Sequence, residues 1–274
     1  MRVAPLEQAV DETRFGGKAA QLAEALRAGL PVPPGVALSV ALVEAVARGD
    51  EDALGEVERA AALLRPPLAA RSSAVGEDGR EASFAGQHLT CLDLRSAAET
   101  AAAALEIHRS AHEGAAAAYR ARLGLDEPPR IAVLVQELVD ADCAGVLFTR
   151  NPLDGADELV VEAAWGLGEA VVAGLVTPDR FRVGRDGTVL ERVAGVKDVA
   201  VVRSPDAGTR QVAIDGNEAR KLCLTDDQLA QLAQLGERCE RVFGRGRDVE
   251  WAYAAGRLHL LQCRPITRAA AARS

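Results

Sequence analysis

The sequence has 274 residues, 49% of them hydrophobic and 26% charged, which is enough chain for one large domain or two lobes with a substantial core. The formal net charge of −8 argues against a general nucleic-acid binder, because binding to a phosphate backbone needs a basic face. No apolar run approaches the roughly 20 residues that cross a bilayer, and the first residues lack the apolar segment of a signal peptide. We therefore expect a globular cytoplasmic protein with neither nucleic acid nor a membrane as a partner.

The five cysteines are widely scattered and odd in number, and no two of them form a Cys-x-x-Cys pair. The sequence therefore predicts neither a disulfide framework nor a zinc site, and we expect the cysteines to be small buried residues. Lysine is rare against an arginine-rich background, with Lys18, Lys197 and Lys221 as its only occurrences. Lys18 stands out because it follows two glycines.

A helix is predicted from Phe15 to Gly29, with Leu22 and Leu26 one turn apart and a glycine at the end. The two glycines and Lys18 lie at the start of this helix. Backbone N–H groups and the helix dipole favour an anion there, so Lys18 is well placed to meet a phosphate. The motif lacks the GxxxxGK[ST] pattern of a Walker A loop, and an ordinary start of a helix has the same composition.

Residues 30–35 are rich in proline and predict a stiff, extended connector. In the segment after it, strands are predicted over residues 36–38 and 68–70, and two helices lie between them, over residues 40–48 and 51–64.

Residues 71–90 combine turn formers and small side chains between two strand-like runs. Glycine and serine let a backbone approach phosphates closely, so we predict a hairpin that lies over a ligand. Arg71, at the end of the preceding strand, would anchor a phosphate. An ordinary mobile hairpin fits the same composition.

Residues 96–123 are rich in alanine and predict a helical region with a structural role. His108 and His112 lie one helical turn apart there. No acidic third ligand accompanies them in a catalytic pattern, so solvated or core histidines are favoured over a metal site.

Three antiparallel strands are predicted next, over residues 131–139, 144–152 and 158–169. The first of them turns polar at Gln136 and Glu137, which can offer backbone and side-chain hydrogen bonds to the edge of an adenine ring. Glu162 falls in the middle of a strand, where a charge is costly without a partner. It is either a metal-side carboxylate or one end of a buried ion pair with Arg150.

Further strands are predicted between residues 180 and 202, and a helix begins at Thr225, which forms a capping box with Gln228. The last predicted element is a β-hairpin, because two apolar runs, 248–253 and 258–267, flank a glycine-containing turn.

Glu250, Gln262 and Arg264 project from the two strands of this hairpin. A carboxylate binds Mg²⁺ through oxygen, and the guanidinium group of Arg264 offers a planar fork of donors to phosphate oxygens. The three side chains therefore suit Mg-ATP. A surface hairpin with a solvated salt bridge is the alternative that these residues alone leave open.

Five segments together resemble one family in their order along the chain. They are GGKAAQLAEALRAGLPVPPG, RSSAVGEDGREASFAGQHLT, VLVQELV, AGVLFTRNPLDG with VVEAAWGLGEAVVAGLVTPDR, and DVEWAYAAGRLHLLQCRPIT. The chain resembles the ATP-grasp nucleotide-binding domain at the N-terminus of phosphoenolpyruvate synthase, pyruvate phosphate dikinase and rifampicin phosphotransferase. The resemblance covers nearly the whole sequence.

The resemblance implies an α+β ATP-grasp fold in which two lobes, with antiparallel sheets and flanking helices, enclose the nucleotide. The lobes would cover roughly residues 1–135 and 136–268, and residues 269–274 would form a tail. It also implies ATP and Mg²⁺ as cofactors. Phosphate contacts would come from Lys18, Arg71 and Arg264, which are the catalytic residues. The other contacts would come from a glycine-rich loop with Gly86, Gln87 and Thr90, an adenine and ribose hinge with Gln136, Glu137 and Val139, and two Mg²⁺ ligands, Glu250 and Gln262.

Full-length members of this family carry a phosphorylated histidine in a Thr-x-Gly-Gly-x-x-x-His context, and none of the four histidines of this sequence has that context. The leading hypothesis is therefore the ATP-binding kinase component of a split phosphotransferase. It would transfer a phosphoryl or pyrophosphoryl group from Mg-ATP to a histidine on a separate protein that also binds the final acceptor. The alternatives are an ATP-sensing regulatory subunit without turnover and, ranked last, an acyl-phosphate-forming ligase.

Overall fold

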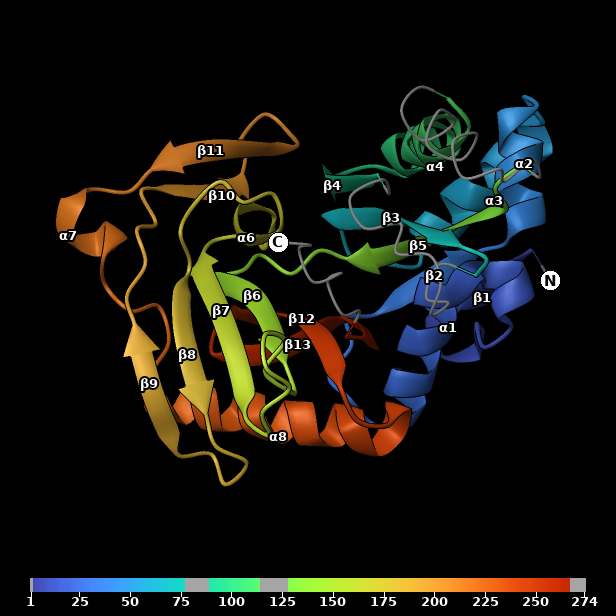
Figure 1. Ribbon diagram of the computed structural model, residues 1–274. Coiled ribbons are helices and arrows are strands. Elements are labelled where there is room, and N and C mark those ends of the chain that lie inside the picture. Colours follow the sequence, from blue (N-terminus) through green and yellow to red (C-terminus); the bar gives the residue numbers. More distant parts are fainter. Residues whose placement is uncertain (1, 77–88, 114–127, 267–274) are drawn as a thin grey trace. The chain divides into compact units, whose positions relative to one another are not determined.

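The computed structural model describes residues 2–76, 89–113 and 128–266 (Figure 1). These residues belong to two compact units. Unit 1 takes its residues from Met1–Arg27, Pro33–Leu138 and Ser204–Gly208, and unit 2 from Ala28–Val32, Val139–Arg203 and Thr209–Ser274. No helix in the described ranges has both the length and the apolar character needed to span a bilayer.

Unit 1 contains a five-stranded antiparallel sheet with the strand order β1-β2-β5-β3-β4. Its strands are β1 (Val3–Pro5), β2 (Gly35–Leu38), β3 (Leu68–Ala74), β4 (Thr90–Leu94) and β5 (Ile131–Glu137). The predicted strands at 36–38 and 68–70 are confirmed, and the one predicted over 131–139 is present but ends at Glu137. Strand β3 continues to Ala74 because its residues pair with β5 along their whole length.

The helical elements of unit 1 are η1 (Leu6–Gln8), α1 (Glu12–Arg27), α2 (Val40–Ala47), α3 (Glu51–Ala61) and α4 (Ala97–His112). Side-chain caps start three of them: Ser39 accepts from the N–H of Leu42, Asp50 from that of Ala53, and Ser96 from that of Glu99. Helices α2, α3 and α4 pack on one face of the sheet (Figure 1). The core between them contains Leu42, Val57, Ile107 and Val133, each fully buried.

Helix α1 begins earlier than predicted and is not continuous. The backbone of Gly16 has a φ of +76° inside the element, so a first turn precedes Gly16 and a regular helix follows it. The earlier start has a local cause, because the side chain of Asp11 accepts from the N–H of Thr13 at 3.0 Å. The predicted glycine stop is confirmed, since α1 ends at Arg27 and Gly29 has a φ of +73°.

Unit 2 contains a six-stranded antiparallel sheet with the strand order β13-β12-β6-β7-β8-β9. Its strands are β6 (Cys143–Phe148), β7 (Leu159–Trp165), β8 (Asp179–Val183), β9 (Val189–Val193), β12 (Arg247–Ala254) and β13 (Arg257–Pro265). The smaller elements are the hairpin strands β10 (Val199–Arg203) and β11 (Thr209–Ala213), with helices α6 (Glu169–Val172) and α7 (Gly216–Ala219).

Helix α8 (Asp226–Phe243) runs across one face of the six-stranded sheet (Figure 1). The predicted capping box between Thr225 and Gln228 is confirmed at its start. Gly236 allows the close packing, because a Cβ atom there would lie 3.2 Å from a methyl group of Leu147 and 3.1 Å from one of Leu159. Leu147 and the residues that share its face of the sheet therefore lie toward α8.

Candidate functional site

The stretch around Lys18 is fixed to the end of strand β3. The N–H of Ala19 donates to the hydroxyl oxygen of Ser73 at 3.0 Å. A Cβ atom on Gly16 would lie only 2.0 Å from the carbonyl oxygen of Ser73, so this approach requires a glycine. Lys18 itself is 7% exposed. The Gly-Gly-Lys motif thus sits where the backbone of α1 meets β3.

Arg71 and Thr90 lie on the same side of the unit 1 sheet as Ser73. Side chains alternate across a strand, so Arg71 and Ser73 share a face, and Thr90 is the direct cross-strand partner of Arg71. This is the face on which α1 lies, opposite the core formed with α2, α3 and α4. Unit 1 therefore brings Lys18, Arg71 and Thr90 to one face. Gly86 and Gln87, predicted for the glycine-rich loop, lie outside the described residues.

The side chains of Gln136 and Glu137 are engaged within the protein. The amide nitrogen of Gln136, which is 4% exposed, donates to the carbonyl oxygen of Pro33 at 3.1 Å. The carboxylate of Glu137 accepts from Arg65 at 3.0 and 3.2 Å. Val139, the third predicted hinge residue, is the first residue after the unit 1 segment that ends at Leu138. Of the backbone and side-chain contacts expected from the sequence, those of the side chains of Gln136 and Glu137 are therefore already taken within the protein.

The hairpin at the end of the described chain has the predicted form. Strands β12 and β13 pair antiparallel around Ala255 and Gly256, whose φ values are +48° and +72°. Glu250 is the direct partner of Gln262 across the ladder, so their side chains leave the same face with Cβ atoms ~5 Å apart. The predicted pair of oxygen ligands is thus on adjacent strands.

This pair points away from helix α8. Val249 is aligned with Leu147, which packs against the helix, and with Cys263 on the other side. Glu250 follows Val249 in β12, and Gln262 precedes Cys263 in β13. Because side chains alternate along a strand, both occupy the opposite face. Arg264 alternates with Cys263 and shares that face. Unit 2 therefore presents Glu250, Gln262 and Arg264 together on the sheet surface that α8 leaves uncovered.

Asp248 is a residue of this surface that the sequence reasoning missed. It is the cross-strand partner of Arg264, and its Oδ2 accepts from the Nε of Arg264 at 2.9 Å. A second guanidinium nitrogen, Nη2, lies 2.9 Å from the same oxygen. The spacing in the sequence could have indicated this contact. Asp248 lies two residues before Glu250 and Arg264 two residues after Gln262, so all four side chains share one face of the hairpin.

Burial dominates the electrostatics of Asp248. It raises the pKa of this carboxyl group, Arg264 opposes the rise, and the negative charge of Glu250 adds to it. Within the described part of the chain, Oδ1 of Asp248 is buried without a hydrogen-bond partner. Such an atom is costly, and a cation or a donor of a bound ligand would satisfy it.

The residues on this surface fit a magnesium ion bound together with phosphates. Mg²⁺ takes one or two protein oxygen ligands and completes its shell with phosphates and water. Glu250 and Gln262 supply one carboxylate and one amide oxygen. Across the described ranges, no group of three or more His, Cys, Asp or Glu side chains is arranged to hold a metal by itself.

The ion pair between Glu162 and Arg150, one of the two alternatives for Glu162, has different partners in the structure. Arg150 pairs with Asp157 at 3.6 Å, and Glu162 is the cross-strand partner of Arg180. The His108 and His112 rings stack with centroids 4.1 Å apart on α4, consistent with the predicted structural role.

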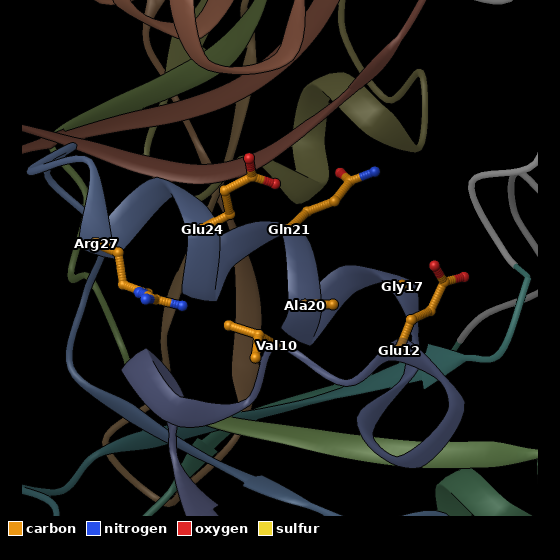
Figure 2. A pocket seen from close by; sticks show the side chains of 7 residues that line it. All are labelled: Val10, Glu12, Gly17, Ala20, Gln21, Glu24 and Arg27. Carbon is orange, nitrogen blue, oxygen red and sulfur yellow. The ribbon is translucent and has the colours of Figure 1, made fainter.

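A pocket of about 510 Å³ lies along helix α1 in unit 1. Figure 2 shows its lining residues, which are Val10, Glu12, Gly17, Ala20, Gln21, Glu24 and Arg27. The lining carries two carboxylates and one guanidinium, and none of the predicted phosphate or metal ligands belongs to it. This pocket therefore does not coincide with the predicted ligand residues, and Gly17 is the one residue of the Gly-Gly-Lys motif in its lining.

Known proteins with similar sequences cover most of this chain. The family model for the pyruvate phosphate dikinase AMP/ATP-binding domain matches residues 39–274. A probable phosphoenolpyruvate synthase of Methanothermobacter thermautotrophicus is 34% identical over 299 residues, covering 92% of this chain and 44% of that protein. Rifampicin phosphotransferase of Streptomyces sviceus is 41% identical over 229 residues, covering 82% of this chain and 26% of that protein. The prodigiosin synthesizing transferase PigC of Serratia marcescens is 36% identical over 291 residues, covering 95% of this chain and 32% of that protein.

The chain spans less than half the length of these relatives. Among solved structures, the ATP-grasp ligase PsnB is 18% identical, with 93% of this chain and 53% of that chain covered and a TM-score of 0.32, a likeness too low to carry an argument. The α+β ATP-grasp fold expected from the sequence is confirmed. The chain belongs to the pyruvate phosphate dikinase AMP/ATP-binding domain family.

Proposed function

We propose that this protein binds Mg-ATP and is the kinase component of a phosphotransferase related to phosphoenolpyruvate synthase. In unit 1, Lys18 and Arg71 bind phosphate oxygens, with Thr90, the cross-strand partner of Arg71, beside them. In unit 2, Arg264 binds the terminal phosphates. Lys18, Arg71 and Arg264 are the catalytic residues of this proposal because they contact the group that is transferred.

The observation that carries the proposal is the composition of the β12–β13 surface. A carboxylate, an amide oxygen and an ion-paired guanidinium group leave one face of two adjacent strands. Phosphoryl transfer needs little covalent chemistry from the protein, and catalysis consists mostly of positioning and of preorganised charge around the phosphates. Asp248 contributes by holding the planar fork of Arg264 in one orientation.

Glu250 and Gln262 are the residues that would hold Mg²⁺. When bound, the ion neutralises charge on the phosphate oxygens. The buried Oδ1 of Asp248 lies in the same part of the ladder and supports a positively charged occupant there.

The purine is read, in this proposal, by the backbone around Gln136, Glu137 and Val139. The N–H groups of Glu137 and Leu138 already donate, at 2.9 Å each, to the carbonyl oxygens of Pro34 and Pro67. The carbonyl of Glu137 and the N–H of Val139 are the pair that matches the amino group and ring nitrogen of adenine.

The acceptor of the phosphoryl or pyrophosphoryl group is a histidine outside the four in this sequence. We place it on a separate protein, which also binds the final acceptor, and we place both proteins in the cytoplasm. The names of the relatives support a group-transfer reaction, since they include a phosphoenolpyruvate synthase and a rifampicin phosphotransferase.

Calorimetric titration of the full chain with ATP and Mg²⁺, beside Glu250→Ala, tests the binding half of the proposal. We expect saturable binding by the parent and a loss of at least about tenfold in the variant, since a metal-held phosphate contact is removed. No heat of binding with the parent protein would overturn the nucleotide site.

The transfer half is tested by adding full-length Streptomyces sviceus rifampicin phosphotransferase whose own ATP-binding domain has been inactivated. Mg-ATP and this chain should then produce an acid-labile phosphohistidine on the added protein. ATP binding without any formation of ADP or AMP under these conditions would favour the ATP-sensing alternative.

A further inference from the structure

Glu137, the last residue of strand β5, is held by a guanidinium group from another part of unit 1. Arg65 lies between α3 and β3 and donates to both carboxylate oxygens of Glu137, from Nε to Oε1 at 3.2 Å and from Nη2 to Oε2 at 3.0 Å. The backbone N–H of Arg65 adds a third bond to Oε1 at 3.2 Å. The two-pronged contact fixes the orientation of the carboxylate as well as its distance.

The segment between α3 and β3 that contains Arg65 also holds the backbone beside the ion pair. In this segment Pro67, two residues after Arg65, accepts at its carbonyl oxygen from the N–H of Leu138 at 2.9 Å. On the other side, the N–H of Glu137 donates to Pro34 at 2.9 Å. The chain leaves the unit 1 segment at Leu138 and continues at Val139 in unit 2. Arg65 thus restrains the last residues before the chain passes from one unit to the next.

The ion pair contributes little to the stability of the fold. The side chain of Arg65 is 86% exposed, against 18% for that of Glu137, and exposed ion pairs are weak. Burial opposes ionisation of Glu137, but the hydrogen bonds and charge of Arg65 outweigh it and hold the pKa of the carboxyl group below its usual range. The pair is therefore formed at neutral pH, and its main effect is on the local geometry of residues 137–139.

We propose that Arg65 is a positioning residue for recognition of the purine base. This inference rests on the proposed function, in which the backbone of Glu137 and Val139 reads adenine. Adenine presents an amino donor and a ring-nitrogen acceptor at neighbouring positions, whereas guanine presents an oxygen acceptor and a ring N–H donor. A backbone carbonyl and N–H held in fixed positions pair with both groups of adenine. Against guanine, the same two backbone groups stay without a hydrogen-bond partner. Arg65 holds them by fixing Glu137.

The test compares the affinities of the full chain for Mg-ATP, Mg-GTP and magnesium tripolyphosphate by calorimetry. Tripolyphosphate carries the phosphates without a base. Arg65→Ala should weaken Mg-ATP about three- to fivefold, the scale of an exposed ion pair, and leave tripolyphosphate unchanged. The ratio of GTP to ATP dissociation constants should fall by a similar factor. Arg65→Lys, which keeps the charge but not the fork, should lie between the parent and the alanine variant.

Arg2→Ala is the matched control, because Arg2 forms a partly exposed ion pair with Glu56, 3.3 Å apart, in the same unit. It should leave all three affinities unchanged. Glu137→Gln removes the partner charge and should reproduce the lowered ratio of GTP to ATP dissociation constants.

Two results would overturn the inference while leaving the proposed function intact. One is an Arg65→Ala variant with the parent's ATP affinity and the parent's ratio of GTP to ATP dissociation constants. The other is an equal loss of affinity for ATP and tripolyphosphate, which would make Arg65 a general contributor to the site. Failure of the parent protein to bind Mg-ATP would instead be a failure of the proposed function.

Discussion

Asp248 and Arg264 face each other across the β12–β13 ladder, with two guanidinium nitrogens of Arg264 at 2.9 Å from a single oxygen of Asp248. This arrangement predicts that Asp248→Asn affects ligand binding more than folding. Burial raises the pKa of Asp248, so the charged form is costly in the folded protein and an uncharged side chain of the same shape avoids that cost. Arg264 loses its charged partner, and we expect about a tenfold loss of Mg-ATP affinity.

Calorimetry measures the affinity and thermal unfolding measures the stability of the same preparation. Asp157→Asn serves as the control, since Asp157 is a half-exposed carboxylate that pairs with Arg185 in unit 2. A large drop in melting temperature with unchanged affinity for Mg-ATP would show that Asp248 stabilises the sheet and does not position Arg264.

Gly16 and Gly49 form a matched pair for testing the contact between α1 and β3. Both have positive φ values, +76° and +80°, but a Cβ atom would meet Ser73 at Gly16 and nothing within 4 Å at Gly49. Gly49→Ala should cost about 1–2 kcal/mol from the backbone alone. Gly16→Ala adds the overlap with Ser73 and should cost about 1–3 kcal/mol more. Urea unfolding of both variants gives the difference, and equal losses would mean that α1 moves away from β3 freely.

The sequence was informative where side-chain alternation and a turn signal act together. Strands β12 and β13 could be placed because a glycine turn sets their register, and register alone puts Glu250 opposite Gln262. The same reasoning reaches Asp248 and Arg264, since both lie two residues from that pair. The ion pair was missed because its importance depends on burial of Asp248, which the local pattern does not reveal.

Contacts between distant segments could not be derived. The close approach of Gly16 to Ser73, which leaves no room for a Cβ atom, joins residues far apart in the chain, and a glycine pair shows only that such an approach is permitted. The contact of Arg65 with Glu137 spans 72 residues and depends on the pairing of β3 with β5. The assignment of residues 28–32 to unit 2 and 204–208 to unit 1 likewise has no local signal.

Lys197 stood out in the sequence as a rare lysine, and in the structure it is fully buried in an ion pair with Asp179, which is equally buried. Asp179 also accepts from the backbone N–H groups of Gly195 at 2.8 Å and Cys223 at 2.9 Å. Removing one charge leaves the other buried without compensation, so Asp179→Asn and Lys197→Met should each destabilise by about 3–5 kcal/mol.

The double variant Asp179→Asn with Lys197→Met should lose less than the sum of the two single losses, because no isolated charge remains. Chemical denaturation of the four proteins completes the cycle. Additive losses would indicate that the two side chains act independently and that the hydrogen bonds of Asp179 to the backbone carry its contribution.

His108 predicts how stability depends on pH. Burial lowers its pKa from the ordinary 6.5, the neighbouring His112 lowers it further, and the carboxylates of Glu44 and Glu113 oppose the shift. The unfolded chain therefore binds a proton more readily than the folded one, and folding stability falls as the pH drops through 6.5. His259, whose pKa burial and Arg257 also lower, acts in the same direction. We expect the melting temperature to fall between pH 7 and pH 5.5.

His108→Gln should flatten this dependence, and the double variant with His259→Gln should flatten it further, with little change above pH 7.5, where both histidines are neutral in either state. Carboxylates such as Glu240, whose ordinary pKa of 4.5 is lowered in the fold, act at more acidic pH, so a scan that stops at pH 5 separates the two effects. A melting temperature that falls equally steeply in the double variant would assign the loss to groups other than these histidines.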